Sequence, residues 1–295
     1  AHGQVTYRLF WGLPSGAPPA QALPSAQEEA GLIVTGEAPG LEISNEYYTA
    51  KLDPKSGALA RARIAGATES RDSLDWMFYQ HVPMHFGVDV WSPPQAWDHD
   101  YDWTSPPNQR VESGPIALRY HRWGPMQKYP DIVASITYTF YAHVPYIYVS
   151  STMEFTQERS VRAVRMGEIV VSHTHRASGV DERDADGKSP DVFTHYAWPE
   201  ENGAVTVIEV NAHRDDEGRA NLEGMAPGAL GILERDVPWV AGYHADRAYG
   251  MASLRRAQFA GNRLGNPIPK VVPCTYVANY GWGFTYWSRP MVYPY

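Results

Sequence analysis

Hydrophobic and polar residues alternate along much of this chain, most clearly over residues 134–155. Ile136 and Tyr138 fall on one side of an extended chain, and the Ser and Thr residues between them fall on the other. Successive side chains leave a strand on opposite faces, so this period of two predicts a half-buried strand. Pro145 cannot donate to a strand partner, which predicts a break before a second strand over 146–155. Two long strands need a larger sheet to cover them, and we therefore expect most of the chain to be β-sheet.

Shorter segments repeat this pattern between glycine- and proline-rich turns. Residues 41–52 alternate as a strand, and the chain returns as a partner strand over 58–64. Between them, Asp-Pro-Lys-Ser-Gly (53–57) predicts a tight turn, because Pro fixes φ and Gly permits a positive φ. Further β character is predicted over residues 5–11, 160–174, 205–210 and 271–277.

Two segments do not follow the strand pattern. Residues 13–38 are rich in Pro, Ala and Gly, so residues 1–40 are interpreted as an N-terminal strand and linker, ahead of one domain over 41–295. Residues 80–103 contain adjacent prolines and many polar aromatic residues. This composition predicts a long irregular loop, and such loops usually carry function, so we interpret it as the wall of a cleft.

Four segments of the sequence resemble parts of a known family. Residues 43–48 (Ile-Ser-Asn-Glu-Tyr-Tyr) and 52–59 (Leu-Asp-Pro-Lys-Ser-Gly-Ala-Leu) resemble the opening hairpin of galactose-mutarotase-like β-supersandwich domains. Residues 111–120, with their Gly-Pro pair, resemble the strand entry of such domains, and 238–254 resemble their late hairpin. The resemblance covers residues 41–295 in outline and implies an all-β fold, a large antiparallel β-sandwich. Such domains occur in sugar epimerases, glycoside hydrolases and polysaccharide lyases, so it also implies a carbohydrate substrate, although one fold hosts many functions.

Composition narrows the possible partners. The 295 residues are 43% hydrophobic and include 19 Tyr, 10 Trp and a single Cys, with a formal net charge of −8. No basic run is present, so we expect no nucleic-acid partner, and no apolar stretch approaches the length of a membrane span. Abundant aromatic rings fit both strands and the flat apolar faces of sugars. A chain that begins Ala1-His2-Gly3, without Met, is interpreted as a processed product, which favours a secreted or periplasmic location.

No established catalytic motif is present, whether nucleophile elbow, phosphate-binding loop or His-Glu-x-x-His. What remains is His, Tyr and Arg on a β scaffold. Elimination from a uronic acid needs a group that neutralises the carboxylate, a base and an acid, and these side chains suit the three roles. The leading prediction is therefore a polysaccharide or oligosaccharide lyase. Its predicted catalytic residues are His81, His85, His173, His195, Tyr196, Tyr286 and Arg289, and its predicted substrate-binding residues are Trp91, Trp97, His99, Tyr101, Trp103, His175 and Trp287.

No cofactor and no metal site are predicted, although two alternatives stay open. His173 and His175 could form a metal pair, but the sequence identifies no third ligand. Asp184-Ala-Asp186-Gly has a weak similarity to a calcium loop, without the full twelve-residue spacing and its closing Glu. A solvent-exposed turn without a metal would equally account for Asp184 and Asp186.

Three rival functions are also compatible with the sequence. A glycoside hydrolase would need two carboxylates, for which the candidates are Asp89, Asp98, Asp100, Asp102 and Glu168. A sugar epimerase would need a late Glu, and Glu234 is the nearest. A non-catalytic carbohydrate-binding module would use a stacking platform of tryptophans, with Trp91, Trp97, Trp103, Trp282 and Trp287 as candidates.

Overall fold

The computed structural model describes residues 31–65, 84–159, 161, 163–171, 194–209, 232–233, 238–246, 249–254, 271–280 and 283–292. The chain divides into a unit over residues 1–30 and a unit over 31–295, and the architecture below is that of the second unit. Several predictions lie outside the described residues, namely the strand over 5–11, the calcium-like turn, and the functional roles of His81, His173, His175, Glu234 and Trp282.

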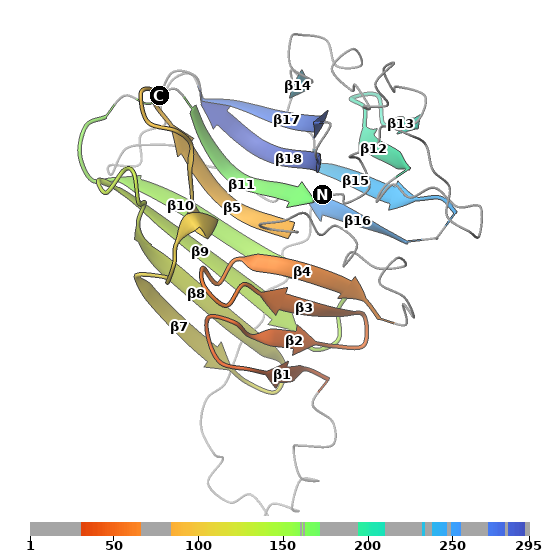
Figure 1. Cartoon of the computed structure of the whole chain (residues 1–295). Helices are drawn as coiled ribbons and strands as arrows, with labels where there is room; N and C mark the ends of the chain where they lie inside the picture. The colour runs from red at the N-terminus through yellow and green to blue at the C-terminus, as the bar shows by residue number, and fades with distance from the viewer. Residues whose placement is uncertain are drawn as a thin grey trace, which may run out of the picture. The chain divides into compact units, whose positions relative to one another are not determined.

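The described part of the chain is all-β and its strand pairs are antiparallel, as the sequence predicts (Figure 1). One sheet has the order β1-β2-β3-β4 and a second the order β10-β9-β8-β7. The first contains β1 (Ile33–Thr35), β2 (Glu42–Ser44), β3 (Tyr48–Leu52) and β4 (Leu59–Ile64), and the second contains β7 (Asn108–Ser113), β8 (Ala117–Pro125), β9 (Ile132–Tyr141) and β10 (Ile147–Phe155).

The described residues also form two further sheets. One has the order β14-β17-β18-β11-β5-β6 and the other the order β13-β12-β15-β16. The first contains β5 (Met84–Trp91), β6 (Asp98–His99), β11 (Ala163–Val171), β14 (Ile232–Leu233), β17 (Val271–Tyr280) and β18 (Gly283–Val292), and the second contains β12 (His195–Pro199), β13 (Val205–Glu209), β15 (Trp239–His244) and β16 (Tyr249–Leu254). No helix in the described residues is long and apolar enough to cross a membrane.

The long hairpin predicted over 134–155 is confirmed as β9 and β10. Along β9 every second residue is buried, from Ile132 to Phe140, and the residues between are half-buried. The two strands pair in a continuous register from Ile132 opposite Phe155 to Phe140 opposite Ile147. The predicted turn before Pro145 is also observed, because no strand covers residues 142–146.

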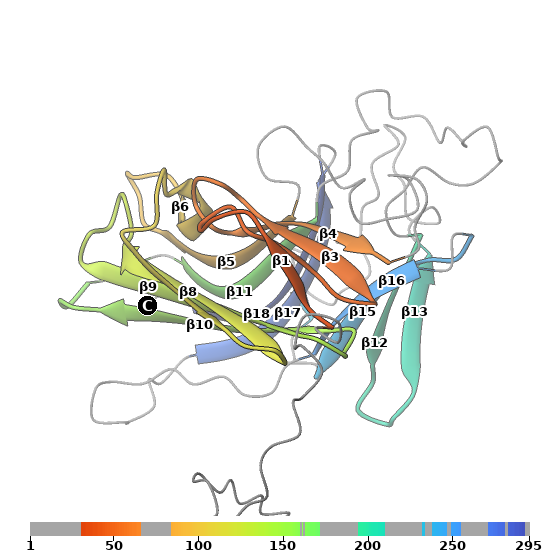
Figure 2. The same cartoon turned by 90° about the horizontal axis from the view of Figure 1, so that it is seen from below.

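The β1–β4 sheet packs on the β7–β10 sheet, and their facing sides form the core of a sandwich (Figure 2). Ile43, Leu52, Tyr120, Tyr138 and Phe140 are fully buried there. Polar contacts also join the two layers: the Leu59 N–H donates to the Tyr138 hydroxyl at 3.3 Å, and the Asn45 amide donates to the carbonyl oxygen of Tyr141 at 2.8 Å. Burial of this apolar surface is the main force that holds the layers together.

The prediction of one irregular loop over 80–103 is wrong for residues 84–91. These residues form β5, which lies between β11 and β6 in the six-stranded sheet. Met84, Phe86, Val88 and Val90 alternate with other residues, so the strand signal was present, and the adjacent prolines lie after the strand rather than within it. Other strands also fall outside the predicted ranges: β1 lies in the segment interpreted as linker, and β18 follows β17 at the aromatic C-terminal segment.

Candidate functional site

The end of β5, the short β6 and the helical turn η3 (Asp100–Asp102) place several polar and aromatic residues together. β5 and β6 form a hairpin in which Asp89 is opposite His99 and Val90 is opposite Asp98. The connection between them contains Pro93 and Pro94 and positions Trp97 just before β6. This part of the segment predicted to wall a cleft is therefore an ordered turn on the edge of a sheet.

Four rings from this hairpin stack one after another. The ring centroids of Trp91 and Trp97 are 5.7 Å apart, those of Trp97 and His99 are 6.4 Å apart, and those of His99 and Tyr101 are 4.6 Å apart. The planes of neighbouring rings differ by 18°, 23° and 20°. All four residues are half-buried. We call Trp91, Trp97, His99 and Tyr101 the aromatic row.

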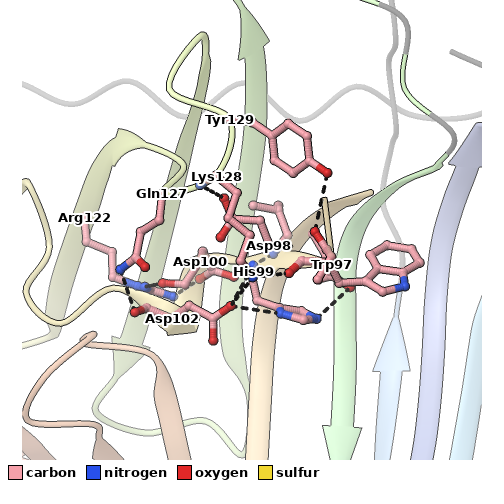
Figure 3. A network of polar contacts seen from close by, with 12 residues as sticks. Trp97, Asp98, His99, Asp100, Asp102, Arg122, Gln127, Lys128 and Tyr129 are labelled. Carbon is pink, nitrogen blue, oxygen red and sulfur yellow. Dashed lines mark hydrogen bonds and ion pairs between the residues drawn. The ribbon is translucent and has the colours of Figure 1, made fainter. Parts of the chain in front are cut away.

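His99, in the middle of the row, lies between two carboxylates. Its Nδ1 is 3.2 Å from Oδ2 of Asp102 (Figure 3). Its Nε2 is 3.9 Å from Oδ2 of Asp89. An ionised carboxylate only accepts hydrogen bonds, so Nδ1 carries the proton in this contact. The same Asp102 oxygen accepts the backbone N–H of His99 at 3.2 Å. These contacts fix the orientation of the ring within the row.

The row is partly open to solvent on its polar side. The Asp102 side chain is 34% exposed and the His99 side chain 20% exposed, whereas the Asp89 side chain is fully buried. The Lys128 amine lies 3.9 Å from Oδ2 of Asp102 and is part of a 39% exposed side chain. A carboxylate, an imidazole and an ammonium group are thus accessible beside the rings.

Lys128 and Tyr129, in the connection between β8 and β9, hold the turn that carries Trp97. The Tyr129 hydroxyl accepts the Ser92 N–H at 2.8 Å and donates to the Ser92 carbonyl oxygen at 3.1 Å. The Lys128 amine donates to the Trp97 carbonyl oxygen, and the Lys128 N–H donates to Oδ2 of Asp98 at 2.6 Å. Figure 3 shows Tyr129 and Lys128 on one side of the turn and His99 with Asp102 on the other.

A buried ion pair supports the opposite end of the site. Arg122, on β8, pairs with Asp100, and neither side chain has exposed surface. Oδ1 of Asp100 also accepts the Val88 N–H at 2.8 Å, so this carboxylate joins β5 to β8 through η3. The Arg122 guanidinium donates to the Ser56 carbonyl oxygen at 3.0 Å and lies 5.3 Å from the centre of the Trp103 ring.

Asp98 and Asp102 differ in their protonation properties. Burial raises the pKa of Asp98, and the hydrogen bond from the Lys128 backbone only partly offsets this effect. Burial also acts to raise the pKa of Asp102, but the hydrogen bond and positive charge of His99 outweigh it, so the net pKa is lowered. Asp102 is therefore the carboxylate of the pair that stays ionised beside the row.

The structure places the predicted residues in different parts of the molecule. Four of the predicted substrate-binding residues form the aromatic row. Trp103 does not join them, because it is 2% exposed, packs against Arg122 and donates its indole N–H to the Pro125 carbonyl oxygen at 3.1 Å. A ring buried in this way offers no surface to a ligand, so the structure places Trp103 in the core rather than on a binding platform.

Four predicted residues lie along the six-stranded sheet. His85 is opposite Val170 of β11, and Tyr286, on the other side of β11, is opposite Ile169. Trp287 is opposite Glu168 of β11, and Arg289 is opposite Cys274 of β17. Adjacent rows of a sheet lie on opposite faces, so the register puts His85 and Trp287 on one face and Tyr286 on the other.

His195 and Tyr196 begin β12, away from the aromatic row in the strand order. The His195 ring stacks on Tyr243 of β15, with centroids 5.0 Å apart and planes 11° apart, and its Nδ1 lies 2.9 Å from the Thr194 hydroxyl. Tyr196 is fully buried and belongs to the core. His195 remains partly accessible, whereas a ligand cannot reach Tyr196 without displacing core residues.

The carboxylates proposed for glycoside hydrolysis are mostly structural. Asp89, Asp98 and Asp100 have no exposed surface, and Asp100 is committed to Arg122. Only Asp102 among the four aspartates of this segment is partly exposed. In the described residues, no group of three or more His, Cys, Asp or Glu side chains has the arrangement of a metal site.

The sequence analysis did not identify Arg122, Lys128 or Tyr129 as residues of the site. For Arg122 a signal existed: it follows Leu118 and Tyr120 at a spacing of two, which puts an arginine on the buried face of a strand. A charged residue at such a position indicates a buried partner. No comparable local signal exists for Lys128 and Tyr129, because their partners lie about 30 residues away in the sequence.

Comparison with known proteins adds no relative. No protein-family model matches this chain, and no curated protein sequence is significantly similar to it. The site must therefore be interpreted from its own geometry.

Proposed function

We propose that this protein binds a carbohydrate at the aromatic row. The observation that carries the proposal is the stacking of Trp91, Trp97, His99 and Tyr101, four half-buried rings with nearly parallel planes. Stacked rings cover part of each other's faces, so the apolar surface left to the C–H groups of a sugar is the exposed part of each half-buried ring. Binding sites typically combine such surface with a few fixed polar groups, and Asp102 and Lys128 supply these groups here.

The test is binding of a panel of neutral and acidic oligosaccharides, measured by isothermal titration calorimetry. We expect Trp97→Ala to weaken binding at least five-fold, which corresponds to about 1 kcal/mol. Tyr146→Ala is the matched control, because Tyr146 is 55% exposed and lies outside the row. Equal affinities of Trp97→Ala and the unmodified chain for every ligand bound would contradict the proposal.

A second candidate function is β-elimination from a glycan that contains uronic acid. Its support is the register of the six-stranded sheet, in which His85 and Trp287 lie two rows apart and therefore share one face, so that a candidate base and an aromatic residue are on the same side. A His is a suitable base for removing the proton next to the carboxylate. Since His85 and Trp91 are six positions apart, they are about 20 Å apart along β5. A lyase would therefore bind an oligosaccharide across several sugar units. The proposal includes the galactose-mutarotase-like architecture and a secreted or periplasmic location, where such polymers occur.

Elimination creates a conjugated double bond, so the assay is ultraviolet absorbance during incubation with uronic-acid polysaccharides, with and without a chelator. We expect His85→Ala to abolish the rise while ligand binding persists. A loss of activity on adding the chelator would indicate a metal. No rise with any polymer that the protein binds would favour the binding function alone.

A further inference from the structure

The outer face of the β7–β10 sheet carries a second cluster of charged residues, remote from the aromatic row in the strand register. Arg110 on β7 is opposite His121 on β8, and Glu112 on β7 is opposite Arg119 on β8. These four side chains line a shallow hollow of about 170 Å³. Residues directly opposite one another on neighbouring strands share a face, which explains why they meet.

The two guanidinium groups share one carboxylate. Nη2 of Arg110 is 2.8 Å from Oε1 of Glu112, and Nη1 of Arg119 is 3.7 Å from Oε2 of the same residue. A guanidinium has five N–H donors, so a single carboxylate uses few of the ten donors present. Two positive charges against one negative charge leave the hollow with a net positive charge. Exposed fractions of 69% and 56% for the two arginine side chains keep these donors accessible.

The imidazole of His121 also lines the hollow, and its neighbours hold it in place. Nε2 of His121 is 2.8 Å from the Ser135 hydroxyl, and the ring stacks on Trp123 with centroids 4.3 Å apart. Burial lowers the pKa of His121, and the positive charge of Arg119 lowers it further. The ring is therefore held in place by neighbours on both β8 and β9.

Two hydroxyl groups lie next to the hollow on the neighbouring strand β9. Thr137 is opposite His121 and Thr139 is opposite Arg119. Both are half-buried and alternate along β9 with buried residues, so they lie on the outer face beside the charged cluster. Positive charge beside a row of hydroxyls suits a ligand that carries an anionic group and several hydroxyls.

We propose that this hollow binds the oxyanion group of a polyhydroxylated ligand such as an acidic sugar, with Arg110 and Arg119 contacting the anion and Thr137 and Thr139 contacting the hydroxyls. Arginine matches the geometry of carboxylate, sulfate and phosphate groups through paired N–H donors. The site does not depend on the aromatic row, so either one can fail without the other.

The test follows the imidazole signal of His121 by NMR, assigned by its loss in His121→Gln. The probes are glucuronate, acetate, inorganic sulfate and glucose. We expect a saturable shift with glucuronate and none with glucose, together with a higher pKa for His121 in the complex, because the bound anion offsets the guanidinium charges. Glucuronate should bind more tightly than acetate, which has the carboxylate without the hydroxyls, and a shift with sulfate as well would show that the site also accepts tetrahedral anions.

Arg119→Gln should weaken glucuronate binding at least five-fold. Lys51→Gln is the matched control, since Lys51 is a surface cation that pairs with a single carboxylate, Glu42, at 3.6 Å. It removes the same charge from the protein and should leave binding unchanged. A glucuronate shift that survives Arg119→Gln, or no saturable shift, would overturn the site. Equal affinities for acetate and glucuronate would overturn its assignment to a sugar.

Discussion

The guanidinium of Arg122 and the carboxylate of Asp100 form an ion pair in which neither side chain reaches solvent. The pair connects β8 to η3, and Asp100 extends the connection to β5 through the Val88 N–H. It therefore joins the sheet of β7–β10 to the hairpin that carries the rings. Removing either partner would leave an uncompensated charge in the core.

We expect Arg122→Leu to lower the free energy of unfolding by about 3–5 kcal/mol, because Asp100 is left buried without its partner. Urea denaturation measures the change. Arg119→Gln, on the same strand but 56% exposed, should change the stability by less than about 0.5 kcal/mol. Similar effects of the two substitutions would show that the buried pair makes no special contribution.

A second prediction concerns the turn between β3 and β4, where Gly57 approaches Tyr120. Gly57 has φ of +70°, and a Cβ at this position would lie 2.3 Å from the Tyr120 hydroxyl oxygen. Gly203, in the turn between β12 and β13, has φ of +83° with no atom within 4 Å of its Cβ position. Both substitutions to Ala place a side chain in the left-handed region, at about 1–2 kcal/mol, but only Gly57→Ala adds a clash in the core.

Gly57→Ala should therefore destabilise the protein more than Gly203→Ala, by about 1–3 kcal/mol. Urea denaturation of the two variants gives the difference. If the two variants lost the same stability, the contact with Tyr120 would contribute nothing and φ strain alone would account for both.

The opposite pKa shifts of Asp98 and Asp102 predict opposite dependences of stability on pH. The pKa of Asp102 is lower in the folded state, so its contribution to stability is present above the unfolded pKa, near 4, and disappears as the pH falls through the folded value. Asp102→Asn should thus destabilise the protein at pH 7 and have little effect at the lowest pH at which the fold persists.

For Asp98 the sign is reversed. Its pKa is raised by burial, so the protonated form stabilises the fold below the unfolded pKa, and this contribution is lost as the pH rises through the folded value. Asp98→Asn retains an oxygen to accept the Lys128 N–H, and its stability relative to the unmodified protein should rise with pH. Unfolding curves at a series of pH values measure both variants, and parallel profiles for the two would contradict the assignment.

Tyr129 is expected to position the aromatic row without touching a ligand. Tyr129→Phe removes the hydroxyl that accepts the Ser92 N–H and donates to the Ser92 carbonyl oxygen. The turn that carries Trp97 should then exchange its amide hydrogens faster, and carbohydrate affinity should fall several-fold. The matched control is Tyr120→Phe, which also removes a buried hydroxyl but one bonded to Gln109 on the far strand β7. Unchanged exchange in the turn of Tyr129→Phe would show that Trp91 and Trp97 stack without this support.

The β class and several of its strands could be predicted from the sequence, because alternation and turn chemistry are local. Residues 132–155 show this most clearly: the period of two reports directly which side chains enter the core, and Pro145 marks the break. The aromatic and polar composition of residues 91–101 also predicted that this segment carries function. This composition did not indicate that Trp91, Trp97, His99 and Tyr101 stack, since this follows from the pairing of β5 with β6.

Which of these residues are available to a ligand depends on long-range packing and could not be predicted from the sequence. Trp103 and Tyr101 look alike in the sequence, but the first packs on Arg122 in the core while the second is half-buried at the end of the row. The partners that decide this come from β8 and from the connection that follows it, 20 or more residues away along the chain. Burial and ion pairing between segments so far apart depend on how the sheets pack, and no local pattern encodes that packing.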